Sequence, residues 1–307
     1  MNTGTNRSVL VTGGRGFIGR GVGKLLQRKG YRVVSLDCAQ DTGTQYDGQS
    51  WQEVQCDIFS AEQLERVFAK ETIGSIIHLA AILPTAAQRD PLPAMQVNLA
   101  GSLSLLEMAR RFDVRRFVFG SSLSVYGSYA AGQIVSEHDR AAPEDIYGAA
   151  KLCVERVGQA YRDRGELEFV SLRIGRVVGA GARSVSSAWR SEIFELLDTR
   201  VPAEIRLPYV GSETILSIHA DDVGRMLVAL MEARRPKHSV YNAPCESVVV
   251  EDLKAHLEGL NSNLHVTLGD GLALGNPRNL DASRFEREFA FEKMPIFERL
   301  REWGRKS

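Results

Sequence analysis

The chain has 307 residues, of which 44% are hydrophobic and 25% are charged, as is usual for a water-soluble globular protein. Its 38 Lys and Arg residues balance 38 Asp and Glu, so no net charge draws it to nucleic acid or to an acidic membrane. The four cysteines show no C-x-x-C spacing and no metal-ligand pattern, which predicts reduced thiols and no metal site. With no secretory signal pattern and no long apolar run, we expect a cytoplasmic protein.

The first half of the chain alternates between short β-branched runs and amphipathic helical patterns. Strands are predicted over 8–12, 31–36, 75–79, 116–119 and 168–174, and helices over 19–29, 61–70 and 94–111. This alternation predicts an α/β fold, a Rossmann-like doubly wound parallel sheet with helices on both faces.

The pattern changes from about residue 175, where glycine and serine become frequent. A strand-then-helix pattern returns at about 213–235, with Asp221 and Asp222 near the helix start, where negative charge is favourable. We therefore expect a Rossmann domain over 1–174. A smaller substrate-binding lobe would follow over 175–307, interleaved with the returning elements.

A glycine-rich stretch, VLVTGGRGFIGRGV, lies between the first predicted strand and helix. Gly13, Gly16 and Gly19 give a G-x-x-G-x-x-G spacing, with Phe17 and Ile18 between the last two. Such a loop makes a tight turn, lets a pyrophosphate approach the backbone, and aims a helix N-terminus at its charge. We expect these five residues to bind a dinucleotide.

An acid 18 residues after the last of these glycines indicates which dinucleotide binds. Asp37 ends the predicted second strand, where a carboxylate accepts hydrogen bonds from the ribose hydroxyls of adenosine. It would repel a ribose phosphate, which favours NAD over NADP. Arg15, inside the glycine loop, argues the other way because it could pair with that phosphate.

A second pattern is EDIYGAAKLCVE, which reads as a helix. Tyr147 and Lys151 stand four residues apart and so share one helix face. Alone, the two could be an exposed surface pair. A nearby ammonium also favours a phenolate, so we expect Lys151 to lower the pKa of Tyr147.

Taken in order, several stretches resemble the extended short-chain dehydrogenases/reductases, in their NAD-dependent epimerase/dehydratase branch. The matching stretches are VTGGRGFIG, CDIF, IIHLAA, VNLAGSLSLLEMAR, FVFGSSLSVYG and YGAAKLCVE. The resemblance covers nearly the whole chain and is strongest over residues 8–179.

The resemblance implies further residues around the cofactor. Asp57 and Ile58 would meet the adenine ring, and Asn98 would help to hold the strand ends around the nicotinamide. The ribose and phosphates would be lined by Leu79, Ala80 and Ala81.

The resemblance also assigns catalytic roles. In this family the Tyr-x-x-x-Lys pair works with a serine or threonine, here Ser122. Tyr147 would take the proton of a substrate hydroxyl, and Ser122 would hold the same oxygen. Lys151 would keep Tyr147 ionised and contact the nicotinamide ribose, so that hydride can leave carbon for the nicotinamide. For Ser124, a substrate contact and a structural turn remain equally open.

The substrate side departs from relatives that act on nucleotide-linked sugars. Those usually carry an asparagine where LRIGRVVG has Arg176, and an arginine where we align Ile215. A diphosphate site would thus lack the arginine, where Ile215 stands, and would have Arg176 in place of the asparagine. Arg176 could still bind phosphate.

The stretch GARSVSSAWRSEIFELL is similar to that of family members that oxidise free hydroxy acids. Arg183 and Arg190, with Ser186 and Ser187 between them, would clamp a substrate carboxylate, which guanidinium binds through two hydrogen bonds. The alternative for these arginines is a solvated loop and the first turn of a helix.

Four other conspicuous residues read as structural. His78 and His219 fit strands better than catalytic bases, and Arg173 fits a strand end. Trp189 fits a core position better than a substrate contact.

The favoured function is an NAD-dependent oxidoreductase acting on a small polar or acidic, sugar-acid-like substrate. A nucleotide-sugar epimerase or dehydratase, such as a UDP-sugar 4-epimerase, is the first alternative, and a non-catalytic dinucleotide sensor is the second. From the resemblance we also expect a homodimer, formed by the helices at 94–111 and 145–162. Leu99, Leu103, Leu106, Val154 and Val157 would serve that interface or the internal core.

Overall fold

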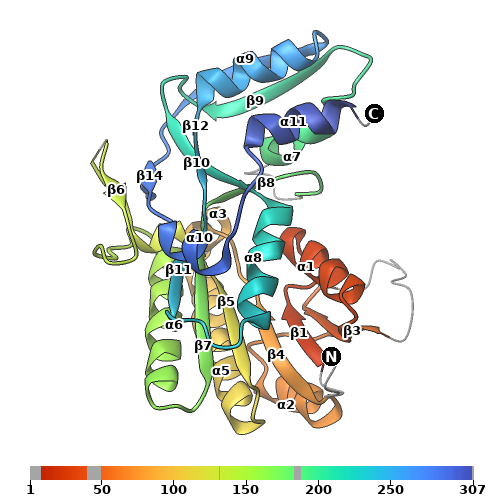
Figure 1. The fold of residues 1–307 in the computed structure, drawn as a ribbon, viewed down its shortest axis with the longest axis vertical. Helices are drawn as coiled ribbons and strands as arrows, with labels where there is room; N and C mark the ends of the chain where they lie inside the picture. Colours follow the sequence, from red (N-terminus) through yellow and green to blue (C-terminus); the bar gives the residue numbers. More distant parts are fainter. Residues whose placement is uncertain (1–7, 40–49, 131, 183–187, 306–307) are drawn as a thin grey trace.

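A parallel sheet forms the larger part of the molecule. The computed structural model describes residues 8–39, 50–130, 132–182 and 188–305 (Figure 1). Its seven strands are β1 (Ser8–Thr12), β2 (Val33–Asp37), β3 (Trp51–Gln55), β4 (Ile73–His78), β5 (Arg116–Ser122), β7 (Glu168–Ile174) and β11 (Val240–Asn242). Their order is β11-β7-β5-β4-β1-β2-β3, and every pair is parallel. The order reverses between β1 and β4, which is where such sheets bind ligands.

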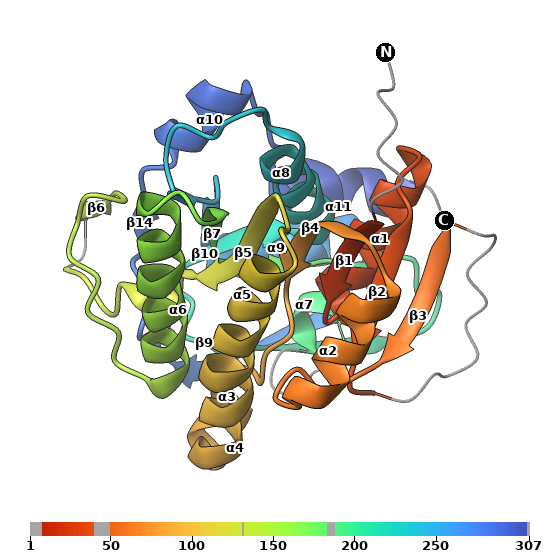
Figure 2. The same ribbon diagram turned by 90° about the horizontal axis from the view of Figure 1, so that it is seen from below.

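Helices cover both faces of this sheet, as Figure 2 shows. One face packs against α1 (Phe17–Arg28) and α8 (Ala220–Glu232), and the other against α2 (Ala61–Lys70), α5 (Ser102–Arg111) and α6 (Ile146–Asp163). Because both faces are covered, strands such as β1 read as unbroken apolar runs rather than as alternating ones. The fold is Rossmann-like, as the sequence predicts.

The smaller lobe stands above the carboxyl ends of the main strands (Figure 1). A three-stranded sheet orders β12 (Glu246–Val249), β10 (Thr214–His219) and β8 (Arg176–Val178), and β9 (Ala203–Tyr209) pairs with β13 (Leu264–Gly271). The helices α7 (Trp189–Glu195), α9 (Val250–Leu260) and α11 (Ile296–Arg305) pack on these strands around a separate apolar core.

The remaining elements are short. A short ribbon pairs β6 (Ile134–Val135) with β14 (Asn279–Leu280), and α10 (Ser283–Phe289) packs beside β11. The segment after β4 forms α3 (Pro84–Arg89) and α4 (Pro91–Met95), and a 3-10 turn, Leu123–Val125, follows β5. Within the described parts of the chain, no helix has the length and apolarity needed to cross a membrane.

Several elements differ from the sequence prediction. The helix predicted over 94–111 is interrupted by a π-helix, Gln96–Gly101, between α4 and α5. A π-turn keeps the apolar spacing of its neighbours approximately, so periodicity did not reveal it. Strand β3 was missed because WQEVQ is mostly polar, as suits the edge of a sheet.

The chain re-enters the main sheet later than predicted. The range 213–235 includes α8, which packs on α1, but its strand β10 belongs to the three-stranded sheet of the lobe. The strand that rejoins the main sheet is β11, beyond residue 235. The division at residue 174 falls between β7 of the main sheet and β8 of the lobe, and it stays a prediction.

Candidate active site

The glycine loop lies at the carboxyl end of β1 and leads into α1. Gly13 has a φ of 64°, and a Cβ there would stand 2.8 Å from the Ala80 backbone nitrogen. At Gly19 a Cβ would stand 2.1 Å from the Gly13 carbonyl oxygen. The first turn of α1 has no side-chain cap at Gly16, so its N–H groups are left for a ligand. The backbone therefore forms the close-packed cradle that a dinucleotide pyrophosphate requires.

Asp37 and Arg15 meet at the end of β2. The Asp37 carboxylate accepts from the backbone N–H groups of Arg15, at 3.1 Å, and of Ala39, at 3.0 Å. The Arg15 guanidinium donates Nε to Glu53 at 2.5 Å and also contacts the Ala39 carbonyl. Glu53 thus neutralises Arg15, the residue that could otherwise pair with a ribose phosphate. This favours NAD over NADP.

The residues predicted around adenine and ribose occupy the loops after β3 and β4. The Asp57 carboxylate accepts from the Phe59 N–H at 2.9 Å and shapes its own turn, while the Ile58 side chain is buried against Gly101. The stretch Leu79–Ala81 is partly exposed just beyond β4. The positions of these residues are compatible with the predicted contacts to adenine and ribose. Those contacts remain predictions.

Asn98 fixes the segment that follows these alanines. Its side chain accepts from the Ile82 N–H at 2.7 Å and donates to the Ile82 carbonyl at 2.8 Å. This reciprocal pair connects the π-helix to the carboxyl end of β4. Asn98 is buried, and its predicted role of holding the strand ends around the nicotinamide stays a prediction.

The three residues predicted to be catalytic meet at the end of β5 and the start of α6. Asp145 caps α6 by accepting from the Gly148 N–H at 2.6 Å, which sets Tyr147 in the first turn. Lys151 stands one turn further, where its Nζ donates to the Gly120 carbonyl at 2.7 Å and lies 5.6 Å from the centre of the Tyr147 ring. Ser122 ends β5 beside them.

The pKa values of this pair correct one expectation. Burial raises the pKa of Tyr147 to about 12, with Asp145 adding to the rise and the Ser122 hydroxyl and Arg190 opposing it. Burial also lowers the pKa of Lys151 to about 7, while the charge of Glu155 opposes that change. The expected lowering of the Tyr147 pKa by Lys151 is therefore wrong for this structure. Loss of water around both groups outweighs their mutual effect.

Ser122 and Ser124 hydrogen-bond to each other in the turn after β5. The Ser122 hydroxyl donates to Ser124 Oγ at 3.1 Å and accepts from the Ser124 N–H at 3.1 Å. Ser122 is partly exposed and Ser124 is buried. This favours the structural alternative for Ser124, which orients Ser122, and leaves Ser122 open to a substrate.

Two arginines of the lobe face the same site. The Arg176 Nε donates to the Tyr209 hydroxyl at 3.2 Å, and its guanidinium lies 5.6 Å from the centre of that ring. Burial lowers the pKa of Arg190, and the nearby Arg176 lowers it further, while Tyr209 and Tyr147 oppose the change. The Arg190 Nε is buried and has no hydrogen-bond partner among the described residues. Among the described residues, neither arginine has an ion pair with a carboxylate.

Two other predicted substrate contacts, Arg183 and Ser187, lie outside the described residues. Ile215 is buried in the core of the lobe and pairs with Val248 across β10 and β12. It cannot replace the arginine that nucleotide-sugar relatives carry there. Tyr209 was not predicted, because a tyrosine after a proline in a short strand gives no functional signal.

The four residues predicted to be structural are buried and make contacts inside the protein. His78 bridges Thr12 and Ser102 at 2.6 and 2.8 Å, and burial lowers its pKa to about 3, so it is neutral. His219 accepts from the Asp221 N–H and caps α8. Trp189 is buried in the core of the lobe, 6.0 Å from the Tyr209 ring centre. Arg173 forms a buried ion pair.

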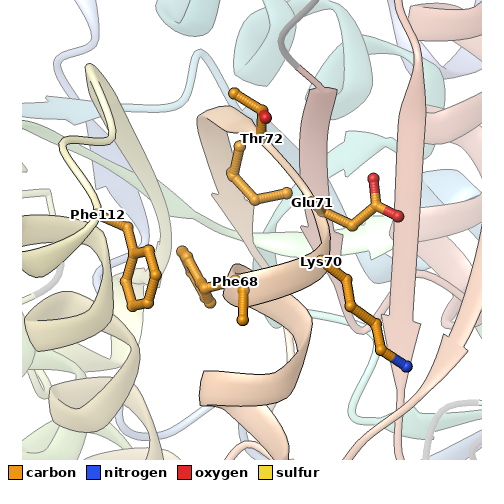
Figure 3. A pocket seen from close by; sticks show the side chains of 7 residues that line it. Phe68, Lys70, Glu71, Thr72 and Phe112 are labelled. Carbon is orange, nitrogen blue, oxygen red and sulfur yellow. The ribbon is translucent and has the colours of Figure 1, made fainter.

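A surface hollow elsewhere has no connection with this site. Figure 3 shows it beside Phe68 and Phe112, with Lys70, Glu71 and Thr72 around it. These residues lie at the ends of α2 and α5 and just before β4, so they are at the amino ends of the strands. The ligand side of a parallel sheet is the opposite edge, so the hollow carries no functional argument.

The comparisons with known proteins agree with this geometry. Residues 9–243 match the model of the NAD dependent epimerase/dehydratase family. The UDP-glucose 4-epimerase of Lacticaseibacillus casei is 33% identical over 218 residues, covering 70% of this chain and 63% of that protein. The UDP-glucose 4-epimerase of Erwinia amylovora is 32% identical over 182 residues, covering 56% and 54%. These matches span less than two thirds of each relative's length.

Solved structures resemble the chain over nearly its whole length. The UDP-glucose 4-epimerase of Thermus thermophilus, in complex with NAD, has a TM-score of 0.80 at 22% identity and covers 98% of this chain and 99% of that chain. The L-threonine 3-dehydrogenase of Trypanosoma brucei has a TM-score of 0.86 at 20% identity, covering 97% and 96%. At these identities the likeness shows a shared fold.

Proposed function

Since the chain belongs to the NAD dependent epimerase/dehydratase family, we propose that it is an NAD-dependent dehydrogenase of a small hydroxy acid. One observation carries the choice of substrate. Arg190, close enough to Tyr147 for their charges to interact, has no carboxylate partner among the described residues and stands beside Arg176. A guanidinium group next to the phenol of Tyr147, with a second one close to it, suits a carboxylate near the reacting carbon.

The chain's own residues support the following division of work. Ser122 and Tyr147 would bind the substrate hydroxyl, and Tyr147 would accept its proton as the carbon is oxidised. The Lys151 ammonium, anchored on Gly120, would stabilise the phenolate. Bound NAD would accept the hydride, and the positive charge of its nicotinamide would favour the phenolate. The glycine loop and Asp37 would hold that cofactor.

A second candidate, a nucleotide-sugar 4-epimerase, is favoured by the names of the curated relatives. In that reaction bound NAD would take up the hydride and return it to the opposite face of the sugar, while the same three residues would move the hydroxyl proton. Against it stand the buried Ile215 and the replacement of the expected asparagine by Arg176. A non-catalytic sensor would not require Ser122, Tyr147 and Lys151 together at one strand end.

The test is NADH formation, followed by near-ultraviolet absorbance, with NAD and two substrate panels. The first panel holds aldonic acids, uronic acids and hydroxy amino acids, and the second holds nucleotide sugars. NADH release with a free acid supports the dehydrogenase. Conversion of a nucleotide sugar without free NADH, detected by chromatography, would overturn it in favour of the epimerase. Silence in both panels, together with NAD binding, would favour the sensor.

We also propose a homodimer built on α5 and α6. Leu106 and Val154 are fully buried within the chain, so they serve the internal core rather than an interface. Leu99, Leu103 and Val157 remain partly exposed beside them. Light scattering measures the outcome directly: a mass of about twice the 33.9 kDa chain is expected, and a monomer would contradict the proposal.

A further inference from the structure

A buried ion pair lies one helical turn beyond the catalytic lysine. Glu155 follows Lys151 by four residues, as Lys151 follows Tyr147, so all three share one face of α6. Lys151 and Glu155 expose only 3% and 2% of their surface. Arg173 of β7 donates to Glu155 through Nε and a terminal nitrogen, at 3.0 and 2.7 Å. The reaction described above makes no use of this pair.

Among the described residues, the groups that touch the Lys151 ammonium carry no negative charge. Its Nζ bonds to the Gly120 carbonyl and lies 4.6 Å from the centre of the Phe119 ring, both on β5, and 5.6 Å from the centre of the Tyr147 ring. The 3-10 turn Leu123–Val125, which packs on α6, has no ionisable side chain. A carbonyl dipole and two ring faces are modest support for a charge buried this deeply.

The remaining ionisable neighbours are on β4, α6 and β7. His78 on β4 is neutral, and the Lys151 charge itself disfavours its protonation. Glu155 supplies the negative charge that favours the Lys151 cation. Arg173 on β7 pairs with Glu155, and its guanidinium lies 4.6 Å from the centre of the Tyr126 ring. The negative member of the pair is therefore the one that acts on the Lys151 charge.

We propose that Glu155 is a positioning residue whose carboxylate, fixed by Arg173, raises the share of Lys151 in its ammonium form beside Tyr147. Without it, burial would act on Lys151 unopposed, and more of the side chain would be a neutral amine, which gives the phenolate no support. The expected effect of Glu155 on catalysis rests on the proposed function. The effect of Glu155 on the charge of Lys151 is independent of that function, because the charge is measured without substrate or cofactor.

The first experiment titrates Lys151 by NMR in protein carrying lysine labelled with ¹³C at Cε, with Lys151→Arg to assign its signal. Glu155→Gln should lower the Lys151 midpoint by about one pH unit. Arg173→Met should raise it, because an unpaired carboxylate then faces the ammonium. A merely structural pair would lower the melting temperature in both variants without moving the midpoint in opposite directions.

Two further variants keep the test decisive. The double variant Glu155→Gln/Arg173→Met leaves no buried unpaired charge, and its Lys151 midpoint should still fall. Glu213→Gln removes an equally buried carboxylate, paired with Arg278 at 2.7 Å in the lobe, and should leave the midpoint unchanged. An unchanged midpoint in the double variant would overturn the proposal, even if the single variants do not fold.

The second readout is the pH profile of turnover in the holoenzyme. The alkaline limb of kcat should move to lower pH in the double variant by the same amount as the Lys151 midpoint, while KM stays within about twofold. A Lys151 midpoint that moves in a protein with no turnover would defeat the proposed function alone. Turnover with an unmoved midpoint would defeat the role of Glu155 alone.

Discussion

The cofactor side and the substrate side of this site are built in different ways. The cofactor side uses β1, α1, β2 and β4, which follow one another closely in the chain and pair in one sheet. The proposed substrate side brings Arg190 of α7 near Tyr147 of α6, with Arg176 of β8 and Tyr209 of β9 close to Arg190. The first depends on backbone geometry, and the second on side chains that meet across a second domain.

That difference explains at which positions amino-acid substitutions are tolerated. A pyrophosphate is recognised by backbone N–H groups and close approach, so the sequence must carry glycines at fixed spacing. A substrate anion is recognised by side chains that can come from many strands, loops and helices. We therefore expect the backbone cradle to vary less between relatives than the lobe that would contact the substrate.

The largest expected effect lies where the two sides meet, at the catalytic tyrosine. Tyr147→Phe removes the proton acceptor but keeps the ring beneath Lys151, so kcat should fall about 10³-fold. NAD affinity, measured by calorimetry, should change less than about threefold, because the hydroxyl is not part of the pyrophosphate cradle. Normal turnover in this variant would show that another group acts as the base.

A pair of glycine variants tests the backbone dependence of the cofactor side. Gly13→Ala places a Cβ 2.8 Å from the Ala80 nitrogen at a positive φ, so NAD affinity should fall at least about tenfold, with about 1–2 kcal/mol of stability lost. Gly21→Ala is the matched control, since nothing lies within 4 Å of its Cβ in α1. It should leave NAD binding unchanged and raise the free energy of unfolding, measured by urea titration, by up to about 1 kcal/mol. Equal NAD affinity in both variants would contradict the cradle.

The same contrast accounts for what the sequence predicted. Strands at 8–12 and 168–174 and the helix at 61–70 have the predicted bounds, because buried parallel strands and amphipathic helices carry strong periodic patterns. Ser122, Tyr147 and Lys151 converge at one strand end, as their spacing and the family resemblance implied.

What the sequence did not reveal depends on long-range pairing. Glu53 neutralises Arg15 from an edge strand too polar to be recognised, and Tyr209 reaches Arg176 from 33 residues away. The Tyr147 pKa was predicted in the wrong direction because spacing along a helix gives proximity but not the loss of water around both groups. Burial of this kind is a property of the folded chain.

On the substrate side, Arg190→Gln tests the proposed anion site. It should raise KM for an acid substrate about 10- to 100-fold, the worth of one charge-assisted hydrogen-bond pair, with a smaller change in kcat. Arg206→Gln, at an exposed position of β9, is the control and should behave as the unchanged enzyme. If KM rises equally for a neutral substrate analogue, Arg190 supports the lobe rather than a carboxylate.

The smallest expected effect concerns the choice of cofactor, where one side chain modifies a site otherwise made of backbone. Glu53→Gln keeps a hydrogen-bond acceptor for Trp51 but removes the charge that neutralises Arg15, so Arg15 becomes available to a ribose phosphate. The ratio of NADP to NAD affinity should rise by about 1.5- to fivefold, the range of a partly exposed ion pair. Asp37 still repels the phosphate, so NAD should remain preferred. An unchanged ratio would mean that Asp37 alone decides the choice, and that the contribution of Glu53 is limited to holding Arg15 against the sheet edge.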